Sequence, residues 1–308
     1  MRTVKSLSAV ILATLLALVS TPAARAASLP VPWNLLAALP AQLANPGGPP
    51  PGANDWSCRP SAAHPSPVVL VHGLGANQTV NWQTYSPLLK NNGYCVFSLT
   101  YGVPGEPLPV YQPGGLVRME DSAAEFSRFV DKVLDATGAA KVSILGHSEG
   151  TVMPSYYVKF LGGASKVDKY VGLTPLWDGT TLYGLSHLYK WGQVLVDPLL
   201  NPLCGSCVEF LQGSDFLTKM KSGNGQFQPG VAYTNIVTRY DELVIPYTSG
   251  KGTGPNVRNI VLQDTCPLDF AEHAGLAADR NAAGHVLNAL DPAHPRPVPC
   301  HPAGPLGS

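Results

Sequence analysis

Charged residues are scarce in this chain, and neither sign is in excess. Only 13% of the 308 residues are Asp, Glu, Lys or Arg, and 20 basic residues balance 20 acidic ones. A nucleic-acid-binding protein usually carries a basic patch, and a disordered chain combines low hydrophobicity with a large net charge. The balanced charge and the hydrophobic share of 45% therefore exclude a disordered chain and argue against nucleic acid as a partner.

Apolar segments long enough to cross a membrane are lacking as well. Arg2 and Lys5 precede an uncharged, mostly apolar run over residues 7–19, and a pattern of small residues follows at positions 24–26. This arrangement is typical of a secretory signal peptide, and the run is shorter than the roughly 20 residues that span a bilayer. We therefore expect cleavage after Ala26, a secreted extracellular product and no transmembrane anchor.

Cysteines are few, but their number is even. Six cysteines in an exported chain favour three disulfides, although the sequence alone leaves the pairing open. The pairs we expect are Cys58 with Cys95, Cys204 with Cys207, and Cys266 with Cys300. The first would join neighbouring strands, and the last would pin the C-terminal tail to the last strand region. Cys204 and Cys207 form a C-x-x-C, which could also be redox-active or half of a zinc site, but no second pair or thioredoxin-like context accompanies it.

Proline and glycine are abundant, with 30 and 31 copies. Residues 27–64 are rich in proline and indicate an arm on the surface. From residue 65 onward, apolar runs of strand length alternate with helical patterns, as in an α/β fold with a mostly parallel sheet flanked by helices. The runs cover residues 68–71, 94–99, 142–145, 170–173, 234–237 and 259–262. One amphipathic helix is expected to begin after Ser122, which is spaced from Glu125 as in a capping box, and Gly138 is its expected C-cap.

The motif Gly146-His147-Ser148-Glu149-Gly150 directly follows one of these strands and precedes a helical pattern. A serine between glycines in a strand-to-helix turn is a nucleophile elbow, where the close approach of neighbouring backbone leaves little room for side chains. This setting predicts Ser148 as a nucleophile for acyl transfer. A chance match in an ordinary turn is the alternative.

Acyl transfer also needs N–H donors for the developing oxyanion. One donor is normally the backbone N–H of the residue after the nucleophile, here Glu149, and the other comes from the loop after an early strand. The segment His72-Gly73-Leu74-Gly75 lies in that place, so we expect the N–H of Leu74 to be the second donor. A plain glycine-rich turn is the alternative.

The acid and the base are expected after the last two strands, in the order Ser, Asp, His. Asp241 follows the next-to-last strand, with the adjacent Glu242 as reserve. His273 follows the last strand, with His285 as its main competitor inside an amphipathic helix. Two further acids, Asp178 and Asp215, lie in what looks like an inserted loop.

These motifs together resemble those of the secreted bacterial lipases and esterases of the α/β-hydrolase superfamily, in particular the actinobacterial class 2 type. The matching stretches are residues 69–73, 146–150, 240–244, 246–249 and 267–270 leading into His273. The resemblance covers about residues 54–300. It implies Ser148, Asp241 and His273 as a triad, and Leu74 with Glu149 as the oxyanion hole. Relatives often carry Gln or Met where this chain has Glu149, so we expect that carboxyl group to be paired or to point away from the site.

The domain organisation follows from these features. We expect a signal peptide over residues 1–26, a proline-rich arm over 27–64 and an α/β-hydrolase domain over 65–308. An apolar cap or lid insertion covers about residues 178–230. A wall of the acyl pocket is one interpretation of the cap, and packing of the cap against the domain is the other. The candidate substrate-binding residues are Trp177, Leu182, Leu185, Leu188 and Trp191.

The sequence therefore predicts a secreted triacylglycerol lipase or esterase that works through an acyl-enzyme, with transient contact to a lipid surface. No metal or organic cofactor is needed for this chemistry. An acyltransferase or a cutinase-like polyester hydrolase would use the same triad, and a non-catalytic binding module on this fold is a third reading that the complete triad disfavours.

Overall fold

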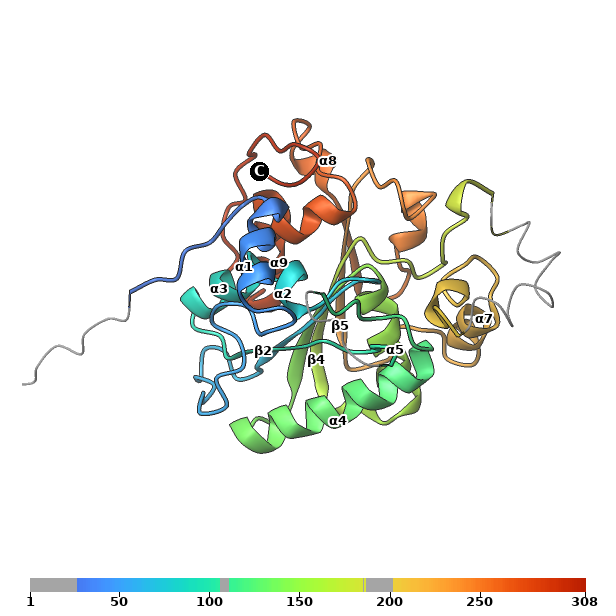
Figure 1. The fold of residues 1–308 in the computed structure, drawn as a ribbon, viewed down its shortest axis with the longest axis horizontal. Helices are drawn as coiled ribbons and strands as arrows, with labels where there is room; N and C mark the ends of the chain where they lie inside the picture. Colours follow the sequence, from blue (N-terminus) through green and yellow to red (C-terminus); the bar gives the residue numbers. More distant parts are fainter. Residues whose placement is uncertain (1–26, 106–110, 185, 187–201) are drawn as a thin grey trace, which may run out of the picture.

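The computed structural model describes residues 27–105, 111–184, 186 and 202–308. Six parallel strands form one sheet in the order β2-β1-β3-β4-β5-β6 (Figure 1). The strands are β1 (Val68–Val71), β2 (Val96–Leu99), β3 (Val142–His147), β4 (Val167–Leu173), β5 (Ala232–Val237) and β6 (Val257–Val261). Each lies on or overlaps an apolar run of the sequence, so the expected mostly parallel sheet is confirmed. Because all strands run the same way, their carboxyl ends meet at one edge.

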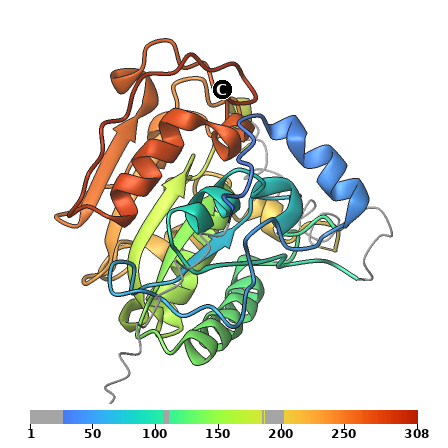
Figure 2. The same ribbon diagram turned by 90° about the vertical axis from the view of Figure 1, so that its left-hand side faces the viewer.

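Helices cover both faces of the sheet (Figures 1 and 2). The longer ones are α3 (Tyr85–Asn91), α4 (Met119–Thr137), α5 (Glu149–Phe160) and α9 (Arg280–Leu290). Strand side chains alternate between the two faces. Val69 and Ile144 accordingly belong to a core cluster with residues of α4 and α5, whereas Leu70 and Leu145 pack with residues of α3 and α9. Both core layers thus fix the strand ends that carry the loops.

Short helical segments occupy the connections. They are η1 (Leu35–Ala37), α1 (Ala38–Ala44), α2 (Gln78–Asn81), η2 (Gly163–Ser165), η3 (Leu182–Gly184), η4 (Ser206–Val208), α7 (Asp215–Lys221), η5 (Tyr247–Gly250), α8 (Leu262–Thr265) and η6 (Ala274–Ala278). The N-terminal arm contains η1 and α1 and is tied to the domain by hydrogen bonds, such as that from Leu29 N to Asn91 Oδ1 at 2.8 Å. The region expected to form a cap contains η3, η4 and α7.

The start of α4 differs from the expectation. The helix begins at Met119, so Ser122 lies inside its first turn and does not cap it, and the proposed capping box is wrong. The backbone N–H of Met119 is instead bound at 2.6 Å by Glu209, which lies 90 residues further along the chain. The carboxylate of Glu125 accepts a hydrogen bond from Gly102 N. Gly138, with φ of 70°, is the expected left-handed C-cap.

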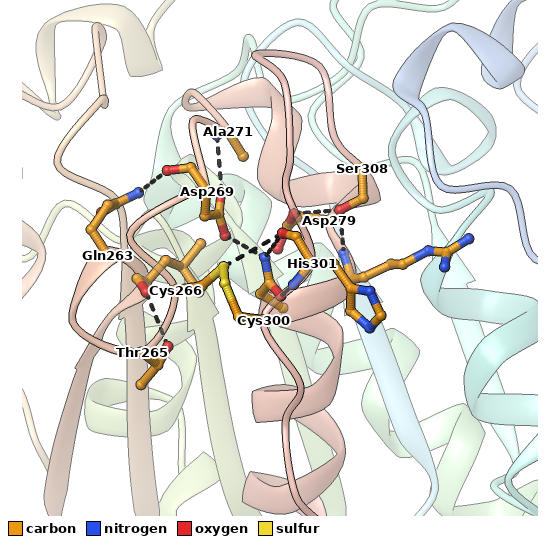
Figure 3. The surroundings of a disulfide bond; sticks show 12 residues. Gln263, Thr265, Cys266, Asp269, Ala271, Asp279, Cys300, His301 and Ser308 are labelled. Carbon is orange, nitrogen blue, oxygen red and sulfur yellow. Dashed lines mark hydrogen bonds between the residues drawn. A yellow bond between two sulfur atoms is a disulfide. The ribbon is translucent and has the colours of Figure 1, made fainter.

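Three disulfides are present, and they join Cys58 to Cys95, Cys204 to Cys207, and Cys266 to Cys300. Figure 3 shows the third of these, between α8 and the C-terminal tail, close to the buried carboxyl groups of Asp269 and Asp279. Within the described ranges, no helix has the length and apolar character that a membrane span requires.

Candidate active site

Ser148 occupies the turn between the end of β3 and the start of α5. Its φ of 56° and ψ of −124° place a non-glycine residue in a strained backbone region, of the kind that is retained at functional sites. A Cβ atom added to Gly146 would lie 2.1 Å from the carbonyl oxygen of Gly150, and one added to Gly150 would lie 2.1 Å from the carbonyl oxygen of Val71. The glycines of the motif are therefore required by close backbone contacts on both sides of the serine.

His273 and Asp241 form a hydrogen-bonded pair beside this turn. His273 Nδ1 lies 2.9 Å and 3.1 Å from the two carboxylate oxygens of Asp241, and both side chains are almost fully buried. Backbone N–H groups of Leu243 and Val244 donate to Asp241 Oδ1 at 3.1 Å and 2.7 Å. A carboxylate held by these donors can accept the Nδ1 proton, which fixes the tautomer with Nε2 available to take up a proton.

Glu242, the reserve candidate for the acid, has a different contact. Its Oε2 accepts a hydrogen bond from the backbone N–H of His273 at 3.0 Å. The two adjacent carboxylates therefore hold the same histidine at two places, Asp241 at the ring and Glu242 at the backbone.

His147, inside the elbow motif, links the serine turn to the histidine loop. Its Nε2 lies 3.0 Å from the carbonyl oxygen of His273, and its Nδ1 lies 3.0 Å from Asn81 Oδ1. Burial lowers the pKa of His147 to about 3, so the ring is neutral at neutral pH and its single N–H can donate to only one of these two oxygens. Asn81 Oδ1 also accepts the backbone N–H of Gly73 at 3.1 Å. No local sequence pattern marks Asn81, which lies at the end of α2 and contacts both the loop after β1 and the end of β3.

The segment expected to supply the second oxyanion donor passes directly beside the serine. A Cβ atom added to Gly73 would lie 3.1 Å from Ser148 Cβ, and both Leu74 and Glu149 line the same pocket as Ser148. Glu149 is the first residue of α5, and N–H groups in a first helical turn have no partner within the helix. This placement leaves its N–H able to bind an oxyanion.

The side chain of Glu149 is 1% exposed and is hydrogen-bonded to the hydroxyl of Tyr101 at 3.2 Å. Burial raises the pKa of this carboxyl group well above its ordinary value. A carboxyl group that stays protonated carries no charge that would oppose an oxyanion. The expected pairing of Glu149 is thus present in the structure.

Ser148 and His273 share a pocket of about 370 Å³ at the carboxyl edge of the sheet. Most of its lining is apolar. The apolar lining residues are Leu35, Leu74, Ala76, Val80, Leu176, Leu182, Phe210, Leu243, Val244, Ala274 and Ala277. Leu35 comes from the N-terminal arm, for which no contribution to the site was expected. Leu182 and Phe210 come from the region expected to form a cap. The pocket can therefore enclose an apolar group next to the serine.

The remaining candidate residues are placed as follows. Trp177 is fully buried in the core, where its Nε1 donates to Asn235 Oδ1 at 2.9 Å, and it is not among the pocket-lining residues. Leu185, Leu188 and Trp191 lie outside the described residues. His285 is in α9 and contacts Thr265 at 3.1 Å, while Asp178 pairs with Lys221. Asp215 begins α7, and neither Asp178 nor Asp215 is among the residues that line the pocket.

In the described part of the chain, no group of three or more His, Cys, Asp or Glu side chains is arranged to hold a metal ion.

Comparisons with known proteins identify the family of this chain and its fold. A family model described as Lipase (class 2) matches residues 65–281. The solved structure of Aspergillus fumigatus lipase B superposes with a TM-score of 0.60 at 18% identity, covering 82% of this chain and 57% of that one. The enol-lactonase from Burkholderia xenovorans LB400 gives 0.48 at 14% identity, covering 75% of this chain and 94% of that one. The likeness to the fungal lipase is one of fold, and this chain spans little more than half of that protein.

Proposed function

Because this chain belongs to the class 2 lipase family, we propose that it is a secreted serine hydrolase that cleaves carboxylic esters of lipids. The observation that carries this proposal is the pairing of His273 Nδ1 with the Asp241 carboxylate, in the same apolar pocket as a serine in a strained elbow turn. This arrangement has the parts that acyl transfer to a serine requires.

In the proposed mechanism, His273 Nε2 takes the proton of Ser148 while Oγ attacks the ester carbonyl carbon. The N–H groups of Leu74 and Glu149 bind the oxyanion, and Asp241 stabilises the imidazolium that forms. The imidazolium then protonates the leaving alcohol as the bond from the carbonyl carbon to the alcohol oxygen breaks, which leaves an acyl-enzyme. A water molecule gives its proton to His273 and attacks the acyl-enzyme, and the return of that proton to Ser148 releases the acid.

The apolar pocket supports a lipid acyl chain as the bound group. Its lining beyond the catalytic residues is dominated by aliphatic side chains, with Leu182 and Phe210 contributed by the insertion. A pocket of this kind stabilises an acyl chain by removing it from water, with about 0.8 kcal/mol for each buried CH₂ group. We take the insertion to form one wall of the acyl site, and a transient contact with a lipid surface follows from the same substrate class.

Secretion is part of the proposal and rests on two observations. Residues 1–26 have the pattern of a signal peptide, and all six cysteines form disulfides, which persist in oxidising compartments. The proposed mature protein consists of the arm over residues 27–64 and the hydrolase domain over 65–308.

The experiment that tests the function measures hydrolysis of p-nitrophenyl esters from acetate to palmitate, and of an emulsified triglyceride, by the protein lacking residues 1–26. Ser148→Ala removes the nucleophile. Ser155→Ala is the matched control, because Ser155 is a buried serine of α5, the helix that follows Ser148, and its hydroxyl donates to the carbonyl oxygen of Val152. We expect long-chain and triglyceride hydrolysis that disappears only in Ser148→Ala. Transfer of the acyl group to an added alcohol in preference to water would favour an acyltransferase. The absence of serine-dependent turnover would contradict the proposal.

A further inference from the structure

The side chain and the backbone of Glu149 have different surroundings in the site. Its backbone N–H is the proposed oxyanion donor, while its carboxyl group is buried against Tyr101 and Gly115. A Cβ atom added to Gly115 would lie 3.0 Å from Glu149 Oε1, so the carboxyl group fits closely there. The hydroxyl of Ser206 is near the same group but donates to the carbonyl oxygen of Gly115, and within the described residues Glu149 Oε2 has no hydrogen-bond partner. A buried acid in this position is costly unless its protons and lone pairs have partners.

Proton counting at Tyr101 assigns the protonation state of Glu149. Tyr101 Oη lies 2.9 Å from the carbonyl oxygen of His72 and 3.2 Å from Glu149 Oε1. A hydroxyl has one proton to donate, and a carbonyl oxygen can only accept. If the tyrosine donates to His72, the second contact is a hydrogen bond only when Glu149 supplies the proton. Both contacts are therefore satisfied together when Glu149 is a neutral carboxylic acid.

The surroundings favour that state. Burial raises the pKa of Glu149 well above its ordinary value and outweighs the effects of Tyr101 and Ser206, which lower it, while the charge of Glu209 adds to the rise. Burial also raises the pKa of Tyr101, so the phenol keeps its proton. The chain of donors then runs from Glu149 through Tyr101 to the carbonyl of His72.

This chain ends on the loop that carries the other oxyanion donor. The ring of Tyr101 also stacks on the ring of His72, with centroids 4.4 Å apart, and the backbone N–H of Tyr101 donates to His72 Nε2. His72 Nδ1 contacts the carbonyl oxygen of Gly73 at 2.8 Å. Tyr101 thus holds His72 at three points, two residues before Leu74.

We propose that Glu149 is a positioning residue for the oxyanion hole. Its carboxylic acid group donates to Tyr101, whose hydroxyl holds the carbonyl of His72 and with it the N–H of Leu74. One residue then provides one oxyanion donor through its backbone and sets the position of the other through its side chain. The inference rests on the proposed hydrolase function, since it assigns a role in stabilising that reaction's transition state.

Substitutions at both ends of the link test this proposal. In Glu149→Gln, a side chain of nearly the same shape still offers an N–H donor to the hydroxyl of Tyr101. Glu149→Leu and Tyr101→Phe remove the hydrogen bond between the two side chains. Displacement of an oxyanion donor weakens stabilisation of the transition state more than it weakens substrate binding. We expect kcat for a p-nitrophenyl ester to fall about 10- to 100-fold in Glu149→Leu and in Tyr101→Phe, with KM nearly unchanged. Glu149→Gln should stay within about threefold of the unmodified protein.

A double-variant cycle shows whether the two substitutions lower kcat by breaking the same hydrogen-bonded chain or by independent effects. Because both substitutions break the same chain, Glu149→Leu combined with Tyr101→Phe should lose no more activity than either alone. Glu125→Gln is the matched control: Glu125 accepts the backbone N–H of Gly102, next to Tyr101, and an amide oxygen can still accept there, so kcat should be unchanged. Additive losses, or a Glu149→Gln protein as impaired as Glu149→Leu, would overturn the proposal.

A second measurement does not depend on turnover or on the folding of the leucine variant. The infrared difference spectrum between the unmodified protein and Glu149→Gln at neutral pH should contain the C=O band of a neutral carboxylic acid. Loss of ionised carboxylate bands instead would overturn the proposal, even if both proteins are active. If the unmodified protein shows no turnover that depends on Ser148, the hydrolase function fails, whereas a neutral-acid band would still support the hydrogen-bonded chain.

Discussion

Asp241 and Glu242 are neighbours in sequence, yet they have different effects on His273. Only Asp241 contacts the imidazole ring, while Glu242 accepts the backbone N–H of His273. Asp241→Asn removes the negative charge that stabilises the imidazolium and permits the wrong tautomer, so we expect kcat to fall about 10³- to 10⁴-fold. In Glu242→Gln an amide oxygen can still accept the backbone N–H, and kcat should stay within about threefold. Comparable losses of kcat in the two proteins would contradict this assignment.

The buried carboxyl group of Asp279 should make the free energy of unfolding depend on pH. It is fully buried, it caps α9 through Ala282 N at 2.7 Å, and its other oxygen accepts the hydroxyl of Ser308 at 2.8 Å (Figure 3). Burial, together with the charge of Asp269, raises its pKa from 3.8 to about 6. The folded chain therefore binds this proton more tightly than the unfolded chain, and the free energy of unfolding decreases as the pH rises from about 4 to about 6.

Asp279→Asn should remove that decrease, because the amide is neutral at every pH and still offers an oxygen to Ala282 N. The shift corresponds to about 3 kcal/mol at most. Urea unfolding at about pH 4 and about pH 7 should show the variant gaining stability relative to the unmodified protein at the higher pH. Parallel pH profiles of the two proteins would contradict the assignment.

The residues of the candidate site differ in how far the sequence could predict them. Ser148, Asp241 and His273 were predicted because each follows a strand in a fixed order. Ser148 and His273 line the same pocket, and Asp241 contacts the ring of His273. Asn81 and Tyr101 were not found, because their roles depend on contacts with residues far away in the sequence. No local pattern marks a side chain whose partner is supplied only by the tertiary structure.

At the scale of whole elements, burial decided which predictions succeeded. Strands such as β1 and β3 are buried on both faces, so their continuous apolar runs identify them without knowledge of their neighbours. The start of α4 depends instead on Glu209, a distant carboxylate that binds the N–H of Met119. The short helix α1 was not predicted either, because the abundant prolines of the arm indicate an extended segment. Its own proline, Pro40, lies in the first turn, where proline is tolerated.

The C-terminal tail is an element that holds the histidine loop. The backbone N–H of Phe270 donates to the carbonyl oxygen of Ala303 at 3.0 Å, and the N–H of Ala303 donates to the carbonyl oxygen of Leu268 at 3.2 Å. The N–H of Glu272 donates to the carbonyl oxygen of Pro305 at 3.0 Å. The disulfide between Cys266 and Cys300 fixes the start of this tail (Figure 3). We expect removal of that disulfide, by substituting both cysteines with alanine, to lower kcat about tenfold, because the loop that carries His273 becomes less well positioned.

The disulfide between Cys58 and Cys95 provides a matched control. The two bridges close loops of similar size, with sequence separations of 37 and 34 residues, so their removal should cost a similar free energy of unfolding, about 3 to 4 kcal/mol. Only the bridge at the tail adjoins the histidine loop. Kinetics at a temperature where both variants stay folded should show the loss of kcat in the Cys266 and Cys300 variant alone. Equal kinetic losses would show that stability, not positioning, is responsible.

At the scale of the whole molecule, exposed apolar side chains occur on segments that border the pocket. Leu36, Leu39 and Leu43 on η1 and α1 are 55%, 60% and 78% exposed, and their spacing places them along one side of the helical segment. Leu35 of the same segment lines the pocket, and residues 27–54 contain no charged side chain. An exposed apolar surface of this kind is typical of an interaction site, and its continuity with the substrate pocket favours a lipid aggregate as the partner. A protein that covered this surface would also block the entrance of the substrate pocket.

Replacement of these three leucines with serine should therefore separate two activities. Hydrolysis of an emulsified triglyceride should fall about tenfold or more, since each exposed leucine that enters a lipid surface contributes about 1 kcal/mol or more. Hydrolysis of a dissolved p-nitrophenyl butyrate should be unchanged. Phe160 and Leu161 are also exposed, but they lie at the end of α5 opposite to Ser148, so their replacement with serine is the matched control. A loss on the dissolved ester, or an equal loss in the control, would show that these leucines do not act through contact with the lipid surface.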